Sequence, residues 1–397
     1  MKLRIKPKPL QRWLHDLYAG LPSGLIPQVE AVSDAAAIPD AERIVVQTAG
    51  RMELPHPLEA AFHGPEYARS EITWPEATAL RLRNLHLVGD QGCVYLADGR
   101  RLEGRQAVWN GGARKVRRPI RRFASDVAAP IFHLTGNNHE NRAHFVAEHL
   151  PRFFAARSAI ALLPELFLIP PGHRHWQAQY LNLLGVEEPR LVEGTPGTLR
   201  VAELLLVPFL CGSMPFGAPA MIRAMSSEMQ LRAQQVGWLP PSTSIARTTQ
   251  GSVLWISRRD APDRQLDNEE ILVETARRLL GEVEVVQLSK LSLPEQVARL
   301  GRCQWIIGGQ GQGLHLPILA SGKQLIILEQ GHPNLDNGWD AAFRNLAELA
   351  GNRAVRLFSG CPPAKHVRGH WHFPDAKFAT DIGRLLRVRD TLPSDVP

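Results

Sequence analysis

Between residues 252 and 329, short apolar runs alternate with longer stretches of helical periodicity. The runs lie at Val253–Ile256, 305–307 and 325–328, with a fourth, more polar run at Val283–Val286. A parallel sheet with crossover helices typically shows this alternation. Positive charge follows the first run, and glycines follow run 305–307. Because open α/β sheets bind ligands at the carboxyl ends of their strands, we predict a nucleotide- or phosphate-binding half-domain here.

A second alternation of strands and helices comes earlier in the chain. We expect strands at Leu166–Ile169 and 204–207, and helices at 176–184 and 219–236. The polar, proline-containing segment 239–250 follows and is the best domain boundary in the sequence. The pattern therefore predicts an α/β protein made of two halves.

The region before these halves differs in composition and in periodicity. Residues 20–80 are rich in Pro and Ala with weak periodicity, which indicates loops and short elements laid over a core. Apolar runs at 85–88 and 93–96 flank Gly89-Asp90-Gln91-Gly92, and this combination predicts a β-hairpin. We therefore expect a β-containing N-terminal region.

A helix is predicted shortly after residue 136. Asn137 or Asn138 can cap it, and Pro151 should kink or break it. Its apolar face consists of Phe145, Val146, Leu150, Phe153 and Phe154.

The composition is that of a soluble globular protein, with 44% hydrophobic and 21% charged residues in a chain of 397. A formal charge of +7 and a pI near 9.5 indicate a polyanionic partner, an anionic membrane surface or a phosphate-rich small ligand. One dense basic cluster is either a solvated loop or the rim of an anion or acceptor site. It comprises Arg114, Lys115, Arg117, Arg118, Arg121 and Arg122.

Four cysteines lie far apart without a C-x-x-C pair, which favours reduced thiols over structural zinc or a disulfide framework. No apolar run approaches the roughly 20 residues that cross a bilayer, and the N-terminus lacks the apolar core of a signal peptide. We therefore expect a cytoplasmic location. The basic N-terminal arm either packs back on the fold or contacts the inner face of the membrane.

Two arginines follow the first strand of the half-domain. Arg258 and Arg264 are suited to forked hydrogen bonding with phosphate oxygens. The alternative is that both face solvent and pair with nearby aspartates. The loop 308–313 follows the strand 305–307, where glycines let a backbone approach a diphosphate and a following helix offers free N–H groups. Tight strand–helix packing also requires glycine, so this loop is a weak signal by itself.

These residues carry a resemblance to glycosyltransferase family 61. In the second half the family's pattern is matched by Ser257-Arg258, Arg264, Asn268-Glu269, Gln296 and the loop 307–314. Upstream it is matched by Asn141, His144, Glu148, Pro151 and Arg152. The resemblance extends over roughly residues 80–350, and the order and spacing of the motifs are more specific than any one of them.

The resemblance implies an inverting transfer in which a base takes the proton of the acceptor hydroxyl. His144 is the best candidate, since imidazole has a suitable pKa. Without the resemblance, a lone helical histidine is more often a structural residue. Glu148 lies one helical turn on and would orient His144 or act as the base itself. Asn141 and Arg152 would position substrate.

The glycine loop departs from the family pattern. Gln310 replaces a histidine and Gln312 a small residue, while His315 lies one turn further on and would substitute in part. Glutamine can hydrogen-bond a phosphate or a sugar hydroxyl, but it carries no positive charge and exchanges no proton near neutral pH. We expect Gly309, Gly311 and Gly313 to approach the nucleotide sugar with these residues.

Glu329 ends the strand 325–328, where a carboxylate either holds ribose hydroxyls or caps a loop. His366, His370 and His372 have a loose metal-like spacing, but a surface patch is the better interpretation. No Asp-x-Asp motif is present, which argues against a Mg²⁺- or Mn²⁺-dependent transferase. We therefore expect no metal and no cofactor, with arginines and helix dipoles compensating the leaving diphosphate.

The architecture that the resemblance implies is GT-B, with two Rossmann-like lobes facing a central cleft. We expect the second lobe to bind a nucleotide sugar, specifically a UDP-sugar. The first lobe would bind a surface-glycan or polysaccharide acceptor, such as capsule. The expected parts are an N-terminal arm and β-containing region (1–125), a first lobe (126–238), a second lobe (251–360), and a C-terminal tail with a helix (361–397).

Two other classes remain open from the sequence. Gln310 and Gln312 favour a nucleotide-sugar-binding or regulatory protein that has lost catalysis. The high pI and the basic cluster favour a nucleic-acid-binding protein, although scattered charge does not indicate a large nucleic-acid footprint.

Overall fold

The computed structural model describes residues 31–392 with internal gaps. The gaps are residues 33–37, 39, 90–91, 104–123, 137–140, 165, 170–171, 173, 188, 195–196, 213–215, 241–251, 332–339 and 361–368. Several predictions lie outside the described residues: the N-terminal arm, the basic cluster at 114–122, the caps Asn137 and Asn138, most of the 239–250 linker, and His366.

The chain divides into two compact units. The first unit contains Trp74–Gly212 and Phe216–Met221 together with the chain up to Gly50. The second contains Ile222–Pro397 and, from much earlier in the sequence, Arg51–Thr73. Both units mix strands and helices, so the prediction of an α/β protein is confirmed at this level.

The second unit is built on a parallel sheet with the order β14-β13-β15-β16-β17. Its strands are β13 (Val253–Ile256), β14 (Val283–Val286), β15 (Trp305–Gly309), β16 (Gln324–Glu329) and β17 (Arg353–Phe358). All four strand pairs are parallel. The four strands predicted between residues 252 and 329 are therefore confirmed.

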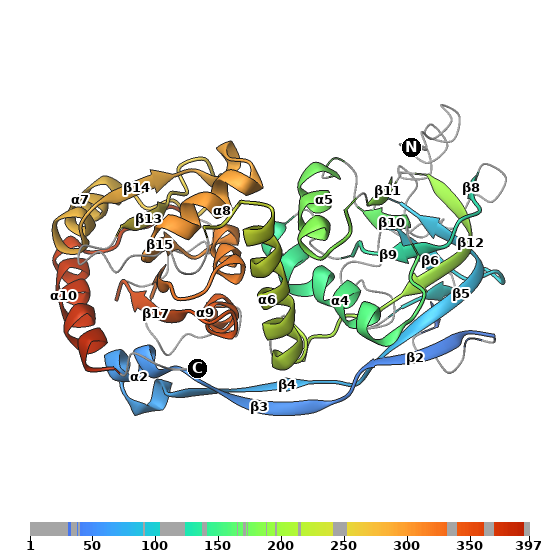
Figure 1. Ribbon diagram of the computed structural model, residues 1–397, viewed down its shortest axis with the longest axis horizontal. Helices are drawn as coiled ribbons and strands as arrows, with labels where there is room; N and C mark the ends of the chain where they lie inside the picture. The colour runs from blue at the N-terminus through green and yellow to red at the C-terminus, as the bar shows by residue number, and fades with distance from the viewer. Residues whose placement is uncertain are drawn as a thin grey trace. The chain divides into compact units, whose positions relative to one another are not determined.

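Helices cover both faces of this sheet (Figure 1). They are α7 (Glu269–Leu280), α8 (Leu293–Arg302), α9 (Asp340–Leu349) and α10 (Asp375–Thr391). Helices α7 and α10 share one apolar core with Trp255, Trp305 and Val355 of the strands. A capping box of Ser292 and Glu295 starts α8, as a serine three residues before a glutamate predicts.

The first unit has a mixed sheet with the order β1-β7-β6-β5-β12-β9-β10-β11, with β2 on β5 and β8 on β12. The short strands are β1 (Ala31–Val32), β2 (Glu42–Gln47), β6 (Cys93–Tyr95), β7 (Arg101–Leu102), β8 (Ser125–Val127), β9 (Ile131–His133), β10 (Leu166–Ile169) and β11 (Arg190–Glu193). The long ones are β5 (Ala77–Val88) and β12 (Thr198–Leu206). The hairpin predicted around Gly89 is confirmed as the β5–β6 pair.

Strands from both sides of residue 125 form this one sheet. β5 pairs with β12 in the antiparallel sense from end to end of β12, from Val88↔Thr198 to Leu80↔Leu206. β9, β10 and β11 are parallel to one another, as in a Rossmann-like lobe. The N-terminal β-region and the first α/β half therefore share one sheet and one apolar core.

Helices of the first unit begin with a continuous segment made of α3 (Arg142–His144), the π-helix η7 (Phe145–His149) and α4 (Leu150–Ala159). Helix α5 (Arg174–Leu183) follows in the first unit, and α6 (Pro219–Gln235) begins there but belongs to the second unit from Ile222 onward. The sequence predicts a kink or a break at Pro151, and the helix does not break there. Pro151 instead lies in the first turn of α4, directly after the wide π turn, where its missing N–H is tolerated.

Residues 51–73 leave the first unit and pack on the second. They include β3 (Gly50–Pro55), α2 (Pro57–His63), η3 (Pro65–Tyr67) and β4 (Arg69–Trp74). Leu58 and Phe62 of α2 enter the apolar core of the second unit. Glu59 is fully buried and bonds Arg344 (2.6 Å) and Arg356 (2.7 Å), so a buried ion network adds to this packing.

Within the described residues, no helix has the length and apolarity needed to span a membrane.

Candidate functional site

The carboxyl edge of the parallel sheet gathers most of the predicted donor-site residues. In the order β14-β13-β15-β16-β17, the chain runs from β13 to one side and then returns to the other side at β15. Open α/β sheets bind ligands at such a reversal, because the loops that leave the two central strands diverge there. Arg258 follows β13, and residues Gln310–Gly313 follow β15.

Arg258 lies directly against the glycine loop. A Cβ added at Gly311 would overlap its Nη1 and lie 2.8 Å from its Cζ. Its Nη2 donates to the carbonyl of Asp263 (3.0 Å), while its buried Nε has no partner in the described part of the chain. A buried, unsatisfied guanidinium nitrogen at a strand-order reversal is a donor group available to an anion.

Arg264 is near enough to Arg258 to affect its ionisation. Burial first, and then the positive charge of Arg264, lower the pKa of the Arg258 guanidinium. Arg264 itself has a φ of +58°, in the left-handed region that a residue with a side chain rarely adopts. Two neighbouring cations on a constrained loop form a pair that a bound diphosphate would stabilise.

The glycines of the loop differ in what a side chain at each position would contact. A Cβ at Gly313 would lie 2.8 Å from Leu288 and 3.0 Å from Ile256, so this position serves helix–strand packing. Gly309 belongs to β15 itself, where a Cβ would lie 3.7 Å from the Arg258 side chain. Only at Gly311 is the close neighbour the guanidinium group.

The element after the loop is a 3-10 helix, η10 (Gln312–Leu319). His315 on it is buried, and its Nδ1 donates to the carbonyl of Gln312. Gln312 is exposed and Gln310 half-buried, with the Gln310 N–H donating to Leu328 (3.1 Å). The two glutamines are thus better placed than His315 to meet a ligand at the sheet edge.

Glu329 ends β16 at the same edge. Its side chain is buried, and its carbonyl accepts from the N–H of Ser359 (2.9 Å). The remaining motif residues hold the framework. Glu269 accepts from Trp255 (2.9 Å) and Ser257 (2.8 Å), and Gln296 donates to the carbonyls of Leu288 and Leu291.

The predicted acid–base residues lie on the irregular helix of the first unit. Asn141 caps it by accepting from the N–H of Ala143 (2.9 Å). His144 Nδ1 is 2.8 Å from Glu148 Oε1, and the two side chains are 16% and 10% exposed. Since a carboxylate can only accept, His144 donates from Nδ1 to Glu148.

The π turn between these residues has a visible cause. The N–H of Leu150 bonds the carbonyl of Phe145, five residues back, and the next residue is Pro151, which has no N–H to donate. Single π turns are frequent at functional sites, because they alter which side chains share a helix face. The predicted pairing of His144 with Glu148 is found across this turn.

Arg152 is fully buried. It donates to the carbonyls of Val207 (2.7 Å), His133 (2.6 Å) and Thr135 (3.1 Å). Burial lowers its pKa to about 9. In this position it would act on a substrate only through the strand ends and the helix that it joins.

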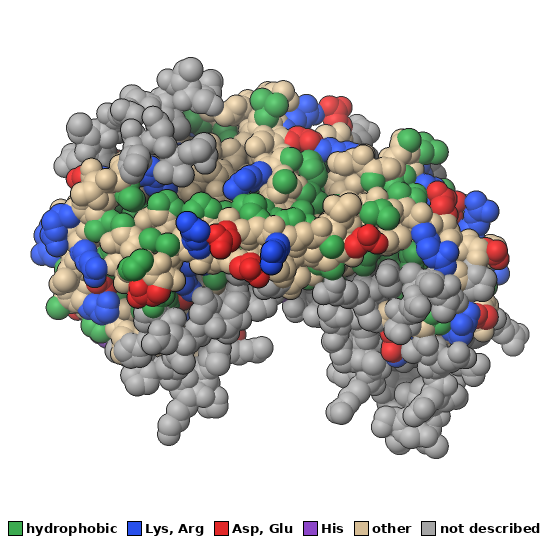
Figure 2. Space-filling view, turned by 90° about the horizontal axis from the view of Figure 1, so that it is seen from below, with side chains coloured by type: hydrophobic (Ala, Val, Ile, Leu, Met, Phe, Trp, Pro, Cys, Tyr) green, Lys and Arg blue, Asp and Glu red, His purple; other side chains and the backbone are tan. Residues whose placement is uncertain are grey.

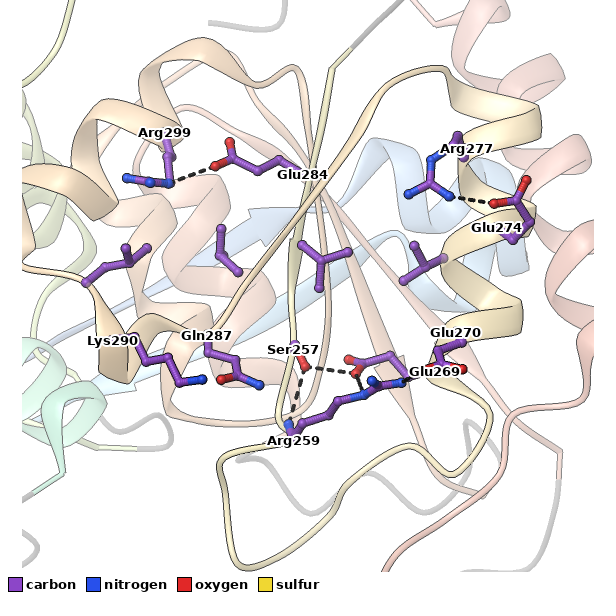
Figure 3. A pocket seen from close by; sticks show the side chains of 14 residues that line it. Ser257, Arg259, Glu269, Glu270, Glu274, Arg277, Glu284, Gln287, Lys290 and Arg299 are labelled. Atoms are coloured by element: carbon purple, nitrogen blue, oxygen red, sulfur yellow. Dashed lines mark hydrogen bonds and ion pairs between the residues drawn. The ribbon is translucent and has the colours of Figure 1, made fainter.

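A pocket of about 780 Å³ lies beside the edge strand β14 (Figure 3). Most of its charged side chains pair with one another: Arg259 with Glu269, Arg277 with Glu274, and Arg299 with Glu284. Such paired charges protect an edge strand from association. Sequence reasoning missed this Arg259–Glu269 pair, since nothing in the local pattern distinguishes Arg259 from Arg258. Among the described residues, no group of three His, Cys, Asp or Glu side chains has the geometry of a metal site.

Comparison with known proteins agrees with the class that these features indicate. The protein is a glycosyltransferase. The family model described as Glycosyltransferase 61 matches residues 143–327, and this match supports the family resemblance that the sequence motifs indicate. The matched segment contains both the His144–Glu148 pair and the Arg258–glycine loop site. No curated protein matches the chain.

Solved structures give only weak likenesses. One is a short-chain flavodoxin associated with a PDU bacterial microcompartment, at 12% identity over 34% of this chain and 96% of that one, with a TM-score of 0.23. Another is oxidised flavodoxin 1 from Bacillus cereus, at 13% identity over 36% and 98%, with a TM-score of 0.22. A third is rubredoxin oxygen:oxidoreductase from Desulfovibrio gigas, at 8% identity over 88% and 68%, with a TM-score of 0.24. At these TM-scores the likenesses carry no argument.

Proposed function

We propose that the protein is an inverting, metal-independent glycosyltransferase of the GT-B type that uses a UDP-sugar donor and a surface-glycan acceptor. The second unit would carry the donor side and the first the acceptor side. The placement of Arg258 against Gly311, at the reversal of strand order, supports this proposal most directly. Within the described part of the chain, the buried Nε of Arg258 has no partner, and it would donate to a phosphate oxygen.

Arg258 and Arg264 would stabilise the leaving diphosphate. As the bond between the anomeric carbon and the diphosphate oxygen breaks, negative charge grows on that oxygen. Two cations fixed beforehand stabilise this charge without reorganisation. Gln310, Gln312 and Gly313 would add neutral hydrogen bonds, and Glu329 would serve the ribose.

His144 would act as the base. Glu148 accepts the Nδ1 proton of His144 and so leaves the lone pair on Nε2. Nε2 would take the proton of the acceptor hydroxyl while its oxygen bonds the anomeric carbon from the face opposite the diphosphate. The sugar is thereby transferred with inversion, and the proton remains on His144 until solvent removes it.

A nucleotide screen followed by kinetics tests the proposal. UDP should raise the unfolding temperature, and the wild type should release UDP from a UDP-sugar when an acceptor glycan is present, with or without EDTA. His144→Ala should lower kcat by about 100-fold or more, since a general base contributes that much. Normal turnover in both His144→Ala and Glu148→Ala would refute the catalytic assignment, and complete loss of activity in EDTA would refute metal independence.

A binding protein without catalysis is the second candidate. It is favoured by Gln310 in the loop and by His315, which lies buried rather than at the sheet edge. This candidate predicts UDP binding without UDP release from any UDP-sugar in the presence of acceptor glycans.

A nucleic-acid-binding function receives less support. Figure 2 shows basic and acidic side chains interspersed on one face, without a large patch of one sign among the described residues that it displays. Nucleic-acid binding depends on concentrated positive charge. Tight, salt-sensitive DNA binding in the absence of any stabilisation by UDP would overturn the transferase proposal.

A further inference from the structure

We propose that Trp371 is a positioning residue of the donor site, and that the C-terminal segment 370–373 completes the loop that carries both arginines. This inference rests on the proposed function of that loop. Trp371 lies outside the segment 143–327 that the family model matches, and no local pattern in the sequence marks it.

The backbone of the segment is paired with the arginine loop. Leu266 and Trp371 form a parallel β-bridge. The N–H of Trp371 donates to Gln265, and the N–H of Asp267 donates to Trp371, both at 2.9 Å. The C-terminal half of the loop is therefore held as if by an added strand.

The indole of Trp371 acts on Arg264. Its Nε1 donates to the carbonyl of Arg264 at 3.3 Å. Arg264 is the loop residue with the positive φ, a conformation that costs free energy unless its surroundings hold it. A hydrogen bond to its carbonyl restrains the peptide plane and with it the direction of the side chain.

The same ring borders Gly309, which the stem of Arg258 also borders. A Cβ placed at Gly309 would lie 3.7 Å from Trp371 Cζ2, 3.7 Å from Arg258 Cδ and 4.0 Å from Leu266 Cδ1. The indole edge and the arginine stem thus converge over one glycine. One indole thus bonds the carbonyl of Arg264 and lies beside the glycine that the Arg258 stem borders.

Asn268 forms two hydrogen bonds with Phe373, the last residue of the segment 370–373. Its Nδ2 donates to the carbonyl of Phe373 (2.7 Å), and its Oδ1 accepts from the N–H of Phe373 (3.3 Å). Trp371 is only 7% exposed and belongs to the core of the unit, so the ring cannot swing away. The Nε1 bond can therefore be removed by substitution while the apolar contacts remain.

Trp371→Phe is the informative variant, since it keeps an aromatic ring but loses the donor. A free loop must be ordered when the donor binds, and loss of one hydrogen bond changes an equilibrium by about fivefold. We expect the Kd for UDP and the KM for the UDP-sugar to rise about fivefold, with kcat changed by less than about twofold. Amide exchange over residues 264–267 should accelerate in the absence of ligand.

Phe378→Leu is the matched control. Phe378 is fully buried in the same core and packs on Phe373 at 5.9 Å between ring centroids. The Phe378→Leu substitution should lower the unfolding temperature without changing the affinity for UDP. Equal UDP affinity in the wild type and Trp371→Phe would overturn this inference alone, even if exchange accelerates. Failure of the wild type to bind UDP would overturn the proposed function and this inference with it.

Discussion

Gly311 and Arg258 show how one missing side chain makes room for a guanidinium group. The φ of Gly311 is 172°, which any residue adopts, so its backbone conformation does not require glycine. The requirement comes from the guanidinium group, which occupies the space of a Cβ. The loop is therefore specific for glycine because of a cation, not because of a turn.

Gly311→Ala should weaken UDP binding by about tenfold or more while the fold persists. The added methyl meets the end of a flexible side chain, so Arg258 moves instead of the backbone. Titration calorimetry with UDP and thermal unfolding measure the two effects. Gly383→Ala on α10 is the control. The nearest atom to a Cβ added at Gly383 would be 3.9 Å away, so the affinity of this variant for UDP should equal that of the wild type. A wild-type affinity in Gly311→Ala would contradict the assigned role of Arg258.

His133 should make the first unit sensitive to acid. Burial, and then the charge of Arg152, lower its pKa to about 3. The unfolded chain takes up a proton below its ordinary pKa of 6.5, whereas the folded chain does not until about pH 3. Acid therefore favours unfolding between about pH 6.5 and pH 3. At pH 5 the free energy of unfolding should be about 2 kcal/mol lower than at pH 7.

Urea unfolding of the wild type and His133→Gln at pH 7 and pH 5 checks this expectation. The variant should lose less stability between the two pH values, by about 2 kcal/mol. His175→Gln, at an exposed position on α5, supplies the comparison. Identical pH dependence in His133→Gln and the wild type would show that His133 does not control acid sensitivity.

At the scale of elements, α2 is the least expected part of the fold. It has few residues, yet it places Glu59 between two arginines of the second unit, one carboxylate oxygen to each. His56 lies in the same network against Glu348. Burial, and then Arg344 and Arg356, lower the pKa of His56 to about 2, so it remains neutral there.

Glu59→Ala should destabilise the second unit by about 3–5 kcal/mol, because it leaves two buried guanidinium groups without their carboxylate. Glu53 pairs with Arg69 at 2.8 Å on the neighbouring strands, but both side chains are more than 60% exposed. Glu53→Ala should therefore cost less than about 1 kcal/mol. Urea unfolding of both variants measures the difference, and equal effects would argue against a structural role for the network.

At the scale of the whole molecule, donor binding should be confined to one set of elements. Amide hydrogen exchange with UDP should show protection over residues 257–268, 309–313 and 370–373. The helix of His144 and Glu148 should be unaffected by UDP alone, because its predicted partner is the acceptor. Protection of that helix without protection of the glycine loop would reverse the assignment of the two sides.

The elements that could be predicted were those with a local cause. Val253–Ile256 and Leu166–Ile169 were predicted to the residue, since each is an apolar run bounded by polar or turn residues. The segment 51–73 was not, because its apolar residues find their partners about 300 positions later. The antiparallel junction of β5 with β12 was missed for the same reason.

The residues of the candidate site also fall into those that a local pattern predicted and those that it did not. Arg258, the glycine loop and the His144–Glu148 spacing were visible because strand ends and an i, i+4 relation are local. The burial of Arg152 and His315 was not, since burial depends on what packs above a residue.

From the sequence by itself came the parallel half-domain at 252–329, the proposal of a ligand site at its carboxyl edge, and the family resemblance. Periodicity and motif order are properties of neighbouring residues, so the sequence records them. Only the tertiary structure decided that Gly311 makes room for Arg258, that Trp371 holds Arg264, and that α2 belongs to the second unit. Each of these depends on packing between residues far apart in the chain, where no local pattern records the partner.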